Sequence, residues 1–271
     1  MSARGVVKLS LAVALAVLFG YPLLWMGLTS LKTEAEFDAG AWSLPASVHT
    51  ANYTEVFSRG RFGRYYLNSV LACGTSVCAA CLIAAAAAYA FARMRFRGKE
   101  TLFVILLGGM MMPVHVTLVP LYSMMDAAGL LNTVLALIGP YIAFALPVSV
   151  FIMRAFFESL PRDMEDAARL DGCSAVGAFW RVALPLSAPA LSTIFILNFV
   201  NMWNEFAFAL TLARGNATTL PVGLWSLSGQ FSADVPRLCA GLSVGVLPGL
   251  VVYFVAQRHI VRGMTAGALS G

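Results

Sequence analysis

A polar stretch at residues 161–185, PRDMEDAARLDGCSAVGAFWRVALP, separates two long apolar runs of the chain. Its charged side chains are Asp163, Glu165, Asp166, Asp171, Arg162, Arg169 and Arg181. Carboxylates and guanidinium groups form ion pairs and charge-assisted hydrogen bonds, so this stretch suits a polar contact better than burial in an apolar core. We therefore expect it to stand in water and to contact another molecule there.

The local pattern of this stretch predicts two short helices joined by a turn. Pro161 suits the first turn of a helix, and acidic residues follow it at the positive end of the helix dipole. Gly172 is placed to end that helix in a left-handed conformation. Ser174 can cap a second helix, and Pro185 ends it before the next apolar run.

A second group of polar side chains lies inside the apolar runs. Asn198, Asn201 and Glu205 are spaced i, i+3, i+7 and share one helix face. A carboxylate is costly in lipid, so Glu205 should face protein or water. We expect this face and His115 to line a translocation path. Two alternatives stay open, because the asparagines could bond neighbouring helices and His115 could serve packing alone.

The sequence offers little for catalysis or metal binding. Cys78 and Cys81 form a Cys-x-x-Cys pair, which can indicate metal or redox chemistry. They lie in an Ala-rich apolar run, where small residues packed in a membrane helix are the favoured interpretation. The chain has no His-Glu-x-x-His and no phosphate-binding P-loop. We expect no catalytic residue, no metal site and no nucleotide bound by this chain.

The composition predicts a membrane protein. Apolar residues make up 59% and charged residues 11% of the chain, whereas soluble domains carry about 25% charged residues. A bilayer can surround this much apolar surface. The expected spans are residues 9–31, 67–92, 102–124, 134–156, 189–212 and 238–257. Pro113 and Pro120 should kink or interrupt the third span, and Pro140 and Pro147 should interrupt the fourth.

The distribution of basic residues predicts the orientation of these spans. The expected cytoplasmic segments hold twelve Lys and Arg residues, namely Arg4, Lys8, Arg93, Arg95, Arg97, Lys99, Arg154, Arg162, Arg169, Arg181, Arg258 and Arg262. The expected outer segments hold six, namely Lys32, Arg59, Arg61, Arg64, Arg214 and Arg237. Because basic residues favour the cytoplasmic side, both termini and the polar stretch should lie in the cytoplasm.

The polar stretch resembles the signature loop of permease subunits from bacterial ABC importers. The family pattern is Glu-Ala-Ala, three residues, Gly, nine residues, Ile, one residue and Leu-Pro. It is met here by Asp166, Ala167, Ala168, Gly172, Val182, Leu184 and Pro185, with Asp for Glu and Val for Ile. The competing interpretation is an amphipathic hairpin that lies on the membrane.

The resemblance extends over most of the chain and points to the carbohydrate-uptake branch. The stretches at residues 110–122, 202–210 and 218–224 and the tail ending GALSG are similar to the shorter, maltose-type permease subunit. Family members of this kind pair with a second permease and two ATP-binding cassette ATPases, and receive solute from an extracytoplasmic binding protein. The tail departs from the family because Ser270 stands at a Lys position, which puts a charge contact with the ATPases in doubt.

The resemblance implies a site on the polar loop. Glu165, Asp166, Ala167, Ala168, Asp171 and Gly172 would form a coupling helix seated on one ATPase. ATP and Mg would be bound by those partner subunits, and this chain would carry no cofactor.

We therefore expect an all-α polytopic membrane protein of six transmembrane helices, with the coupling loop at residues 157–188. Residues 1–8 would be a cytoplasmic N-terminus, residues 9–257 the permease domain and residues 258–271 a cytoplasmic tail. The expected function is the permease subunit of an ATP-driven importer for a sugar or sugar-like solute in the bacterial cytoplasmic membrane. Lipid would surround it, and no nucleic acid would bind. The alternative is a stand-alone secondary transporter or channel.

Overall fold

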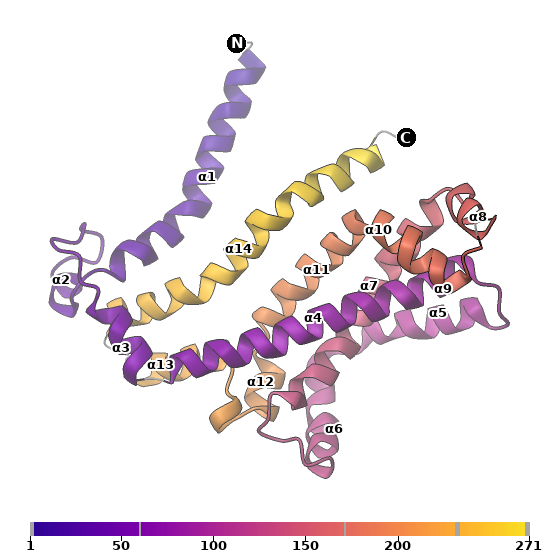
Figure 1. Cartoon of the computed structure of the whole chain (residues 1–271). Helices are drawn as coiled ribbons and strands as arrows, with labels where there is room; N and C mark the ends of the chain where they lie inside the picture. Colours follow the sequence, from indigo (N-terminus) through magenta and orange to yellow (C-terminus); the bar gives the residue numbers. More distant parts are fainter. Residues whose placement is uncertain (1–2, 60, 171, 231–233, 269–271) are drawn as a thin grey trace. The chain divides into compact units, whose positions relative to one another are not determined.

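The computed structural model describes residues 3–59, 61–170, 172–230 and 234–268, and every regular element within these ranges is a helix (Figure 1). The all-α prediction is thereby confirmed. The chain divides into two compact units. The first consists of Met1–Tyr66 and Leu220–Pro248, and the second of Leu67–Thr219 and Gly249–Gly271. Asp171 and Ser270, which entered the sequence predictions, lie outside the described residues.

The first unit begins with a long apolar helix. Its elements are α1 (Ala3–Thr29), α2 (Glu34–Ala39), α3 (Ala51–Arg59), the start of α4 (Phe62–Arg93), α13 (Leu220–Gln230) and the first part of α14 (Val235–Ala268). Most apolar side chains of α1 are exposed, as Leu18 at 65% and Phe19 at 72% illustrate, and those from Trp25 to Leu28 are half-buried. A helix of this kind is suited to lipid or to a partner helix.

The connection after α1 is ordered by polar contacts. The Lys32 side chain is buried, and its Nζ donates to the carbonyl oxygens of Gly40 and Ala41 at 3.1 and 3.2 Å. Thr33 and Glu36 form a reciprocal capping box that starts α2. These contacts satisfy the polar groups of the loop locally, so the segment expected outside the membrane has defined structure.

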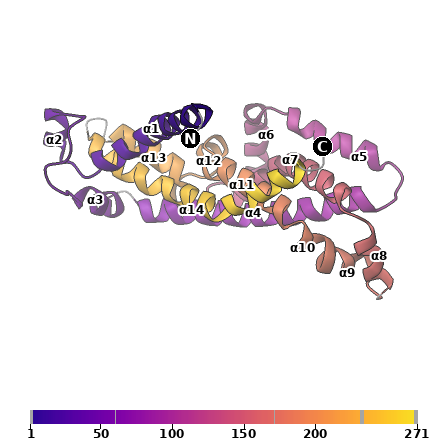
Figure 2. The ribbon, with the colours of Figure 1, turned by 90° about the horizontal axis from the view of Figure 1, so that it is seen from above.

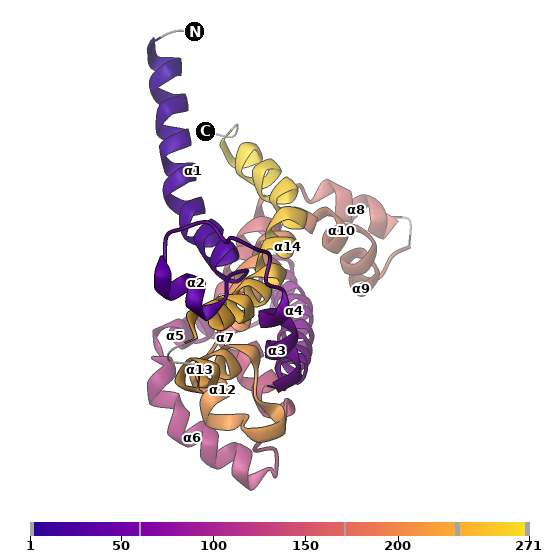
Figure 3. The same ribbon diagram turned by 90° about the vertical axis from the view of Figure 1, so that its left-hand side faces the viewer.

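The second unit carries both candidate sites. Its elements are α4, α5 (Lys99–Gly108), η1 (Gly109–Met111), α6 (Val114–Ala127), α7 (Leu135–Ser159), α8 (Asp163–Leu170), α9 (Ala175–Ala178), the π-helix η2 (Phe179–Ala183), α10 (Leu184–Leu186), α11 (Ala188–Trp203), α12 (Ala207–Leu212), η3 (Gly215–Ala217) and the end of α14. Ala80, Ala84, Ala85 and Ala88 of α4 are fully buried, because small residues let neighbouring helices approach closely. Figures 2 and 3 show α8, α9 and α10 gathered as one group.

The described helices match a membrane-spanning protein. Four are long and apolar enough to cross a bilayer, namely Gly5–Thr29, Phe62–Arg93, Leu135–Ser159 and Val235–Val255. Two further spans arise if each of two bent pairs counts as one. These are Lys99–Met111 with Val114–Ala127, bent by 100°, and Ala175–Leu186 with Ala188–Trp203, bent by 74°. This gives up to six spans by length and composition.

Of the four prolines expected to kink or interrupt the spans, one lies at a helix break and three lie inside a helix. Pro113 lies at the break between η1 and α6, as expected, whereas Pro120 lies inside α6. The prediction for the fourth span was wrong, because α7 runs unbroken from Leu135 to Ser159 with Pro140 and Pro147 inside it. Membrane helices tolerate proline where neighbouring helices and local adjustment satisfy the freed carbonyl groups. The last helix is also longer than the expected sixth span. α14 continues to Ala268, within the segment 258–271 that was expected to be a tail.

Candidate functional site

The polar loop begins with α8, whose two ends are fixed by local hydrogen bonds. At its start, the Arg162 carbonyl oxygen accepts from the backbone N–H groups of Glu165 and Asp166. At its end, Gly172 has φ +85°, and the Cys173 N–H donates to the Ala168 carbonyl oxygen at 3.0 Å. This is the six-to-one bond of a Schellman motif. The predicted role of Gly172 in ending the helix is confirmed.

The second half of the loop starts with the predicted cap. The Ser174 Oγ accepts from the Gly177 N–H at 3.1 Å and begins α9. The chain then widens into the π-helix η2, an uncommon element that often occurs at functional positions. Pro185 lies in the first turn of α10 and Pro189 in the first turn of α11. The helix–turn–helix prediction thus holds, with a π-helix that the sequence pattern did not indicate.

The side chains of α8 divide between two directions. Asp166 and Ala167 are exposed, Ala168 is half-buried, and Leu170 is 90% exposed. Glu165, in contrast, is 5% exposed. Residues that the sequence grouped into a single contact surface therefore separate, because successive side chains of a helix point about 100° apart. Glu165 is turned toward the rest of the second unit, and Asp166, Ala167 and Leu170 face outward.

Glu165 is held by two residues near the end of α4. Arg93 Nε donates to Glu165 Oε1 at 2.7 Å, and the two side chains are only 5% and 7% exposed. The Tyr89 hydroxyl donates to Glu165 Oε2 at 2.8 Å. Arg93 Nη2 also donates to the carbonyl oxygen of Leu160, at the end of α7, at 2.8 Å. One guanidinium thus connects α4, α7 and α8.

This cluster was missed by the sequence reasoning. In the sequence, Arg93 is only one of several basic residues that follow the second expected span. The available signal was the i, i+4 spacing of Tyr89 and Arg93, which places both on one face of α4. Nothing in the local pattern identifies Glu165 as their partner.

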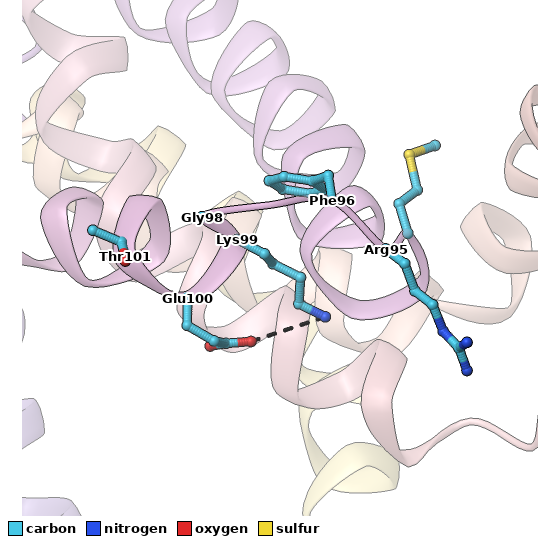
Figure 4. A pocket seen from close by; sticks show the side chains of 7 residues that line it. Arg95, Phe96, Gly98, Lys99, Glu100 and Thr101 are labelled. Carbon is cyan, nitrogen blue, oxygen red and sulfur yellow. Dashed lines mark ion pairs between the residues drawn. The ribbon is translucent and has the colours of Figure 1, made fainter.

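The loop between α4 and α5 carries Arg95 and Arg97, and Lys99 begins α5. The loop borders a cavity of about 450 Å³, shown in Figure 4 with the Lys99–Glu100 ion pair at 3.9 Å. Glu100 also accepts two hydrogen bonds from Arg154 of α7, at 2.8 and 3.0 Å. In Figure 4 Arg95 extends away from this pair. The bidentate contact of Arg154 ties α5 to α7 beside the polar loop.

A second cavity, of about 530 Å³, lies among α6, α7, α11 and α12. Its lining includes His115, Asn198, Asn201 and Glu205, so the structure brings all four predicted residues of the translocation path together. Aliphatic residues and four aromatic side chains form the rest of the wall, and the aromatic residues are Tyr141, Phe144, Phe206 and Phe208. Polar groups among aromatic faces are typical of a cavity that binds a small polar molecule.

Asn198 also makes a structural contact. Its Nδ2 donates to Ser149 Oγ of α7 at 2.9 Å, and both residues are buried. Asn201, one turn further along the same face, is exposed to the cavity. The two interpretations left open by the sequence therefore apply to different residues, with Asn198 bonding a neighbouring helix and Asn201 facing the cavity.

Glu205 lies in the break between α11 and α12. Its carboxylate accepts from the backbone N–H groups of Phe208 and Ala209, at 2.7 and 3.1 Å. The Tyr141 hydroxyl donates to Glu205 Oε2 at 2.9 Å. Three donors thus satisfy a charge that would otherwise be costly at this depth. Glu205 fixes the local course of the backbone while bordering the cavity.

Comparisons with known proteins place the chain in a family. Residues 77–266 match the family described as binding-protein-dependent transport system inner membrane component. The chain is 39% identical over 254 residues to the sulfoquinovosyl glycerol transport system permease protein of Agrobacterium fabrum, an alignment that covers 93% of this chain and 89% of the relative. It is 33% identical to the trehalose/maltose transport system permease protein of Thermococcus litoralis, over 96% of this chain and 95% of the relative.

A solved structure shows the same fold. A chain of a bacterial ABC transporter involved in the import of the acidic polysaccharide alginate superposes with a TM-score of 0.80 at 24% identity, covering 95% of this chain and 96% of the other. The expected resemblance is therefore confirmed at the level of sequence and of fold. The chain belongs to the family of binding-protein-dependent transport system inner membrane components and is a permease subunit of an ABC importer.

Proposed function

We propose that this permease subunit forms part of the path by which a sugar or sugar-like solute enters the cell. The cavity bordered by His115, Asn201 and Glu205 supports this proposal most directly. Its polar groups can hydrogen-bond hydroxyls, and the rings of Tyr141 and Phe144 offer apolar faces of the kind that the C–H faces of a sugar ring pack against. The two relatives described above are named for the transport of sulfoquinovosyl glycerol and of trehalose and maltose, which agrees with this chemistry.

Membership of this family supports the following set of partners. An extracytoplasmic binding protein delivers the solute, a second permease completes the path, and two ATPase subunits bind ATP and Mg. In this arrangement the spans rock between inward-open and outward-open states around the cavity, which is alternating access. This chain contributes no cofactor of its own.

The outward face of α8 is the proposed contact with one ATPase. Asp166 and Ala167 are exposed there, together with Leu170, whose side chain is 90% exposed. Gly172 keeps the helix short, and Asp171 belongs to the same contact by the resemblance of the loop. The exposed Leu170 would gain free energy from burial against a partner, which supports placing the contact on this face.

The proposed location is the bacterial cytoplasmic membrane, with both termini in the cytoplasm. The expected cytoplasmic segments hold twelve Lys and Arg residues and the expected outer segments hold six, which supports this orientation. The loop between α7 and α11 then lies in the same compartment as ATP.

The test is purification of the tagged chain followed by transport in liposomes. We expect an ATPase and a second permease to co-purify in mild detergent. Proteoliposomes containing this complex should take up a disaccharide or glycoside only when ATP and the binding protein are both present. Uptake by this chain alone, without ATP, would instead support the stand-alone transporter.

A further inference from the structure

Glu165 is the main polar link between α8 and the rest of the second unit. Among the described side chains of α8, it is the one that is buried, while Met164 is 48% and Leu170 90% exposed. Its carboxylate is fully engaged by Arg93 and Tyr89 of α4. These groups therefore give a movement of α8 a direct route to α4.

The charges of this link are shielded from water. The Arg93 and Glu165 side chains are 5% and 7% exposed, unlike the Glu100 and Glu158 partners of Arg154 at 65% and 48%. An ion pair in a medium of low dielectric constant is stronger than an exposed pair. Removing one partner leaves a buried charge without compensation. The link therefore resists being pulled apart when α8 is displaced.

Tyr89 adds an apolar part to the same link. Its ring lies 5.7 Å from the Phe157 ring of α7 and 5.1 Å from the Phe179 ring of η2, measured between centroids. All three residues are buried. The end of α4 thus holds both halves of the polar loop, α8 through the ion pair and η2 through the ring contact.

We propose that Arg93, Tyr89 and Glu165 are positioning residues that form the joint by which movement of α8 is transmitted to α4 and α7. Arg93 reaches α7 through its bond to the Leu160 carbonyl oxygen, so one side chain connects three helices. The inference rests on the proposed contact of α8 with an ATPase. It goes further by naming the residues of the permease that transmit the displacement of α8 once the ATPase is bound.

The experiment uses the complete importer in proteoliposomes and measures two rates, solute uptake and ATP hydrolysis. The informative quantity is uptake per ATP hydrolysed. We expect Glu165→Gln and Arg93→Met each to lower this ratio about ten-fold while the ATPases stay bound. The double variant should be no worse than either single variant, because the two side chains act as one unit. A purely structural defect would lower both rates together or release the ATPases.

Glu158→Gln is the matched control. It makes the same change of charge at an exposed ion pair of α7, with Arg154, and should leave the ratio within about two-fold of the parent. An unchanged ratio in Glu165→Gln and Arg93→Met overturns the proposal. So do additive effects in the double variant, or an equal loss in the control.

If the charge variants fail to assemble, Tyr89→Phe provides the test of the proposed joint. It removes only the hydroxyl donor to Glu165 and keeps the ring contacts, so the complex should assemble with about a three-fold lower ratio. An assembled Tyr89→Phe complex with the parental ratio would contradict the joint. If the proposed function itself is wrong, the parent protein will show no ATP-driven uptake. That result differs from a failure of the joint, in which the parent takes up solute normally and the variants keep its ratio.

Discussion

The Tyr141 hydroxyl of α7 donates a hydrogen bond to Glu205 in the break between α11 and α12, with 2.9 Å between Oη and Oε2. The same carboxylate accepts two backbone N–H groups from the first turn of α12. A residue that borders the cavity is thus also the one that shapes the chain around it. Changes at Glu205 should therefore affect the geometry of the path as well as its polarity.

Glu205→Ala should lower transport about ten-fold while the complex still assembles, because two backbone donors and the Tyr141 hydroxyl lose their acceptor. Glu205→Gln should be milder, since its amide oxygen can still accept from the backbone. Initial rates of solute uptake in proteoliposomes measure both effects. Normal uptake by the alanine variant would remove Glu205 from the path.

Asn198→Leu should act on stability more than on solute binding. It breaks the buried bond to Ser149 that joins α11 to α7, a contact worth about 1 kcal/mol in membrane proteins. Thermal unfolding of the purified complex should shift to lower temperature, with little change in the solute concentration for half-maximal uptake. Asn201→Leu is the matched comparison, because Asn201 is exposed to the cavity. The opposite pattern in the two variants would reverse the assigned roles.

Gly172→Val should weaken retention of the ATPases through backbone strain alone. No atom lies within 4 Å of the position of an added Cβ, so the cost comes from φ +85° and amounts to about 1 kcal/mol or more. Gly172→Asn should be tolerated, because Asn adopts the left-handed conformation more readily. Co-purification of the ATPases measures both. If both variants lost the same amount of co-purified ATPase, side-chain size at the interface rather than backbone strain would explain the loss.

Asp166→Lys should release the ATPase while leaving the permease folded, because Asp166 is exposed on α8 and its side chain makes no hydrogen bond or ion pair with the side chains that the structure describes. The expected loss is about ten-fold in the amount of ATPase recovered, as for truncation of a central interface residue. Glu158→Lys makes the same change of charge at an exposed position of α7 and serves as the control. Retention of the ATPase by Asp166→Lys would place the docking surface elsewhere.

The fold class and the polar loop were predictable from the sequence. Apolar runs of span length require helices, since no other open structure satisfies its backbone in lipid. The end of α8 was predictable because Gly172 acts locally, through its own backbone conformation. Helix periodicity correctly placed Asn198 and Asn201 on one face of α11, but the expectation that Glu205 shares that helix face was wrong, because α11 ends at Trp203. Glu205 lies in the break before α12 and still borders the same cavity.

The behaviour of α7 and the division of the α8 side chains were not predictable. Pro140 and Pro147 leave α7 continuous, because tertiary surroundings decide whether a freed carbonyl group finds another partner. The spacing could group Glu165 with Asp166 but could not tell which face of α8 meets the permease. Glu165 and Tyr89 are 76 positions apart in the chain, and only packing brings them together.

The sequence by itself thus determined the features that depend on neighbouring residues, namely the apolar helices, the caps of the loop and the motif of the family. The tertiary structure decided which polar groups pair. A buried carboxylate needs a partner to offset its lost hydration, and that partner comes from whichever helix the fold places beside it. For Glu165 this is Arg93 of α4, and for Glu205 it is Tyr141 of α7.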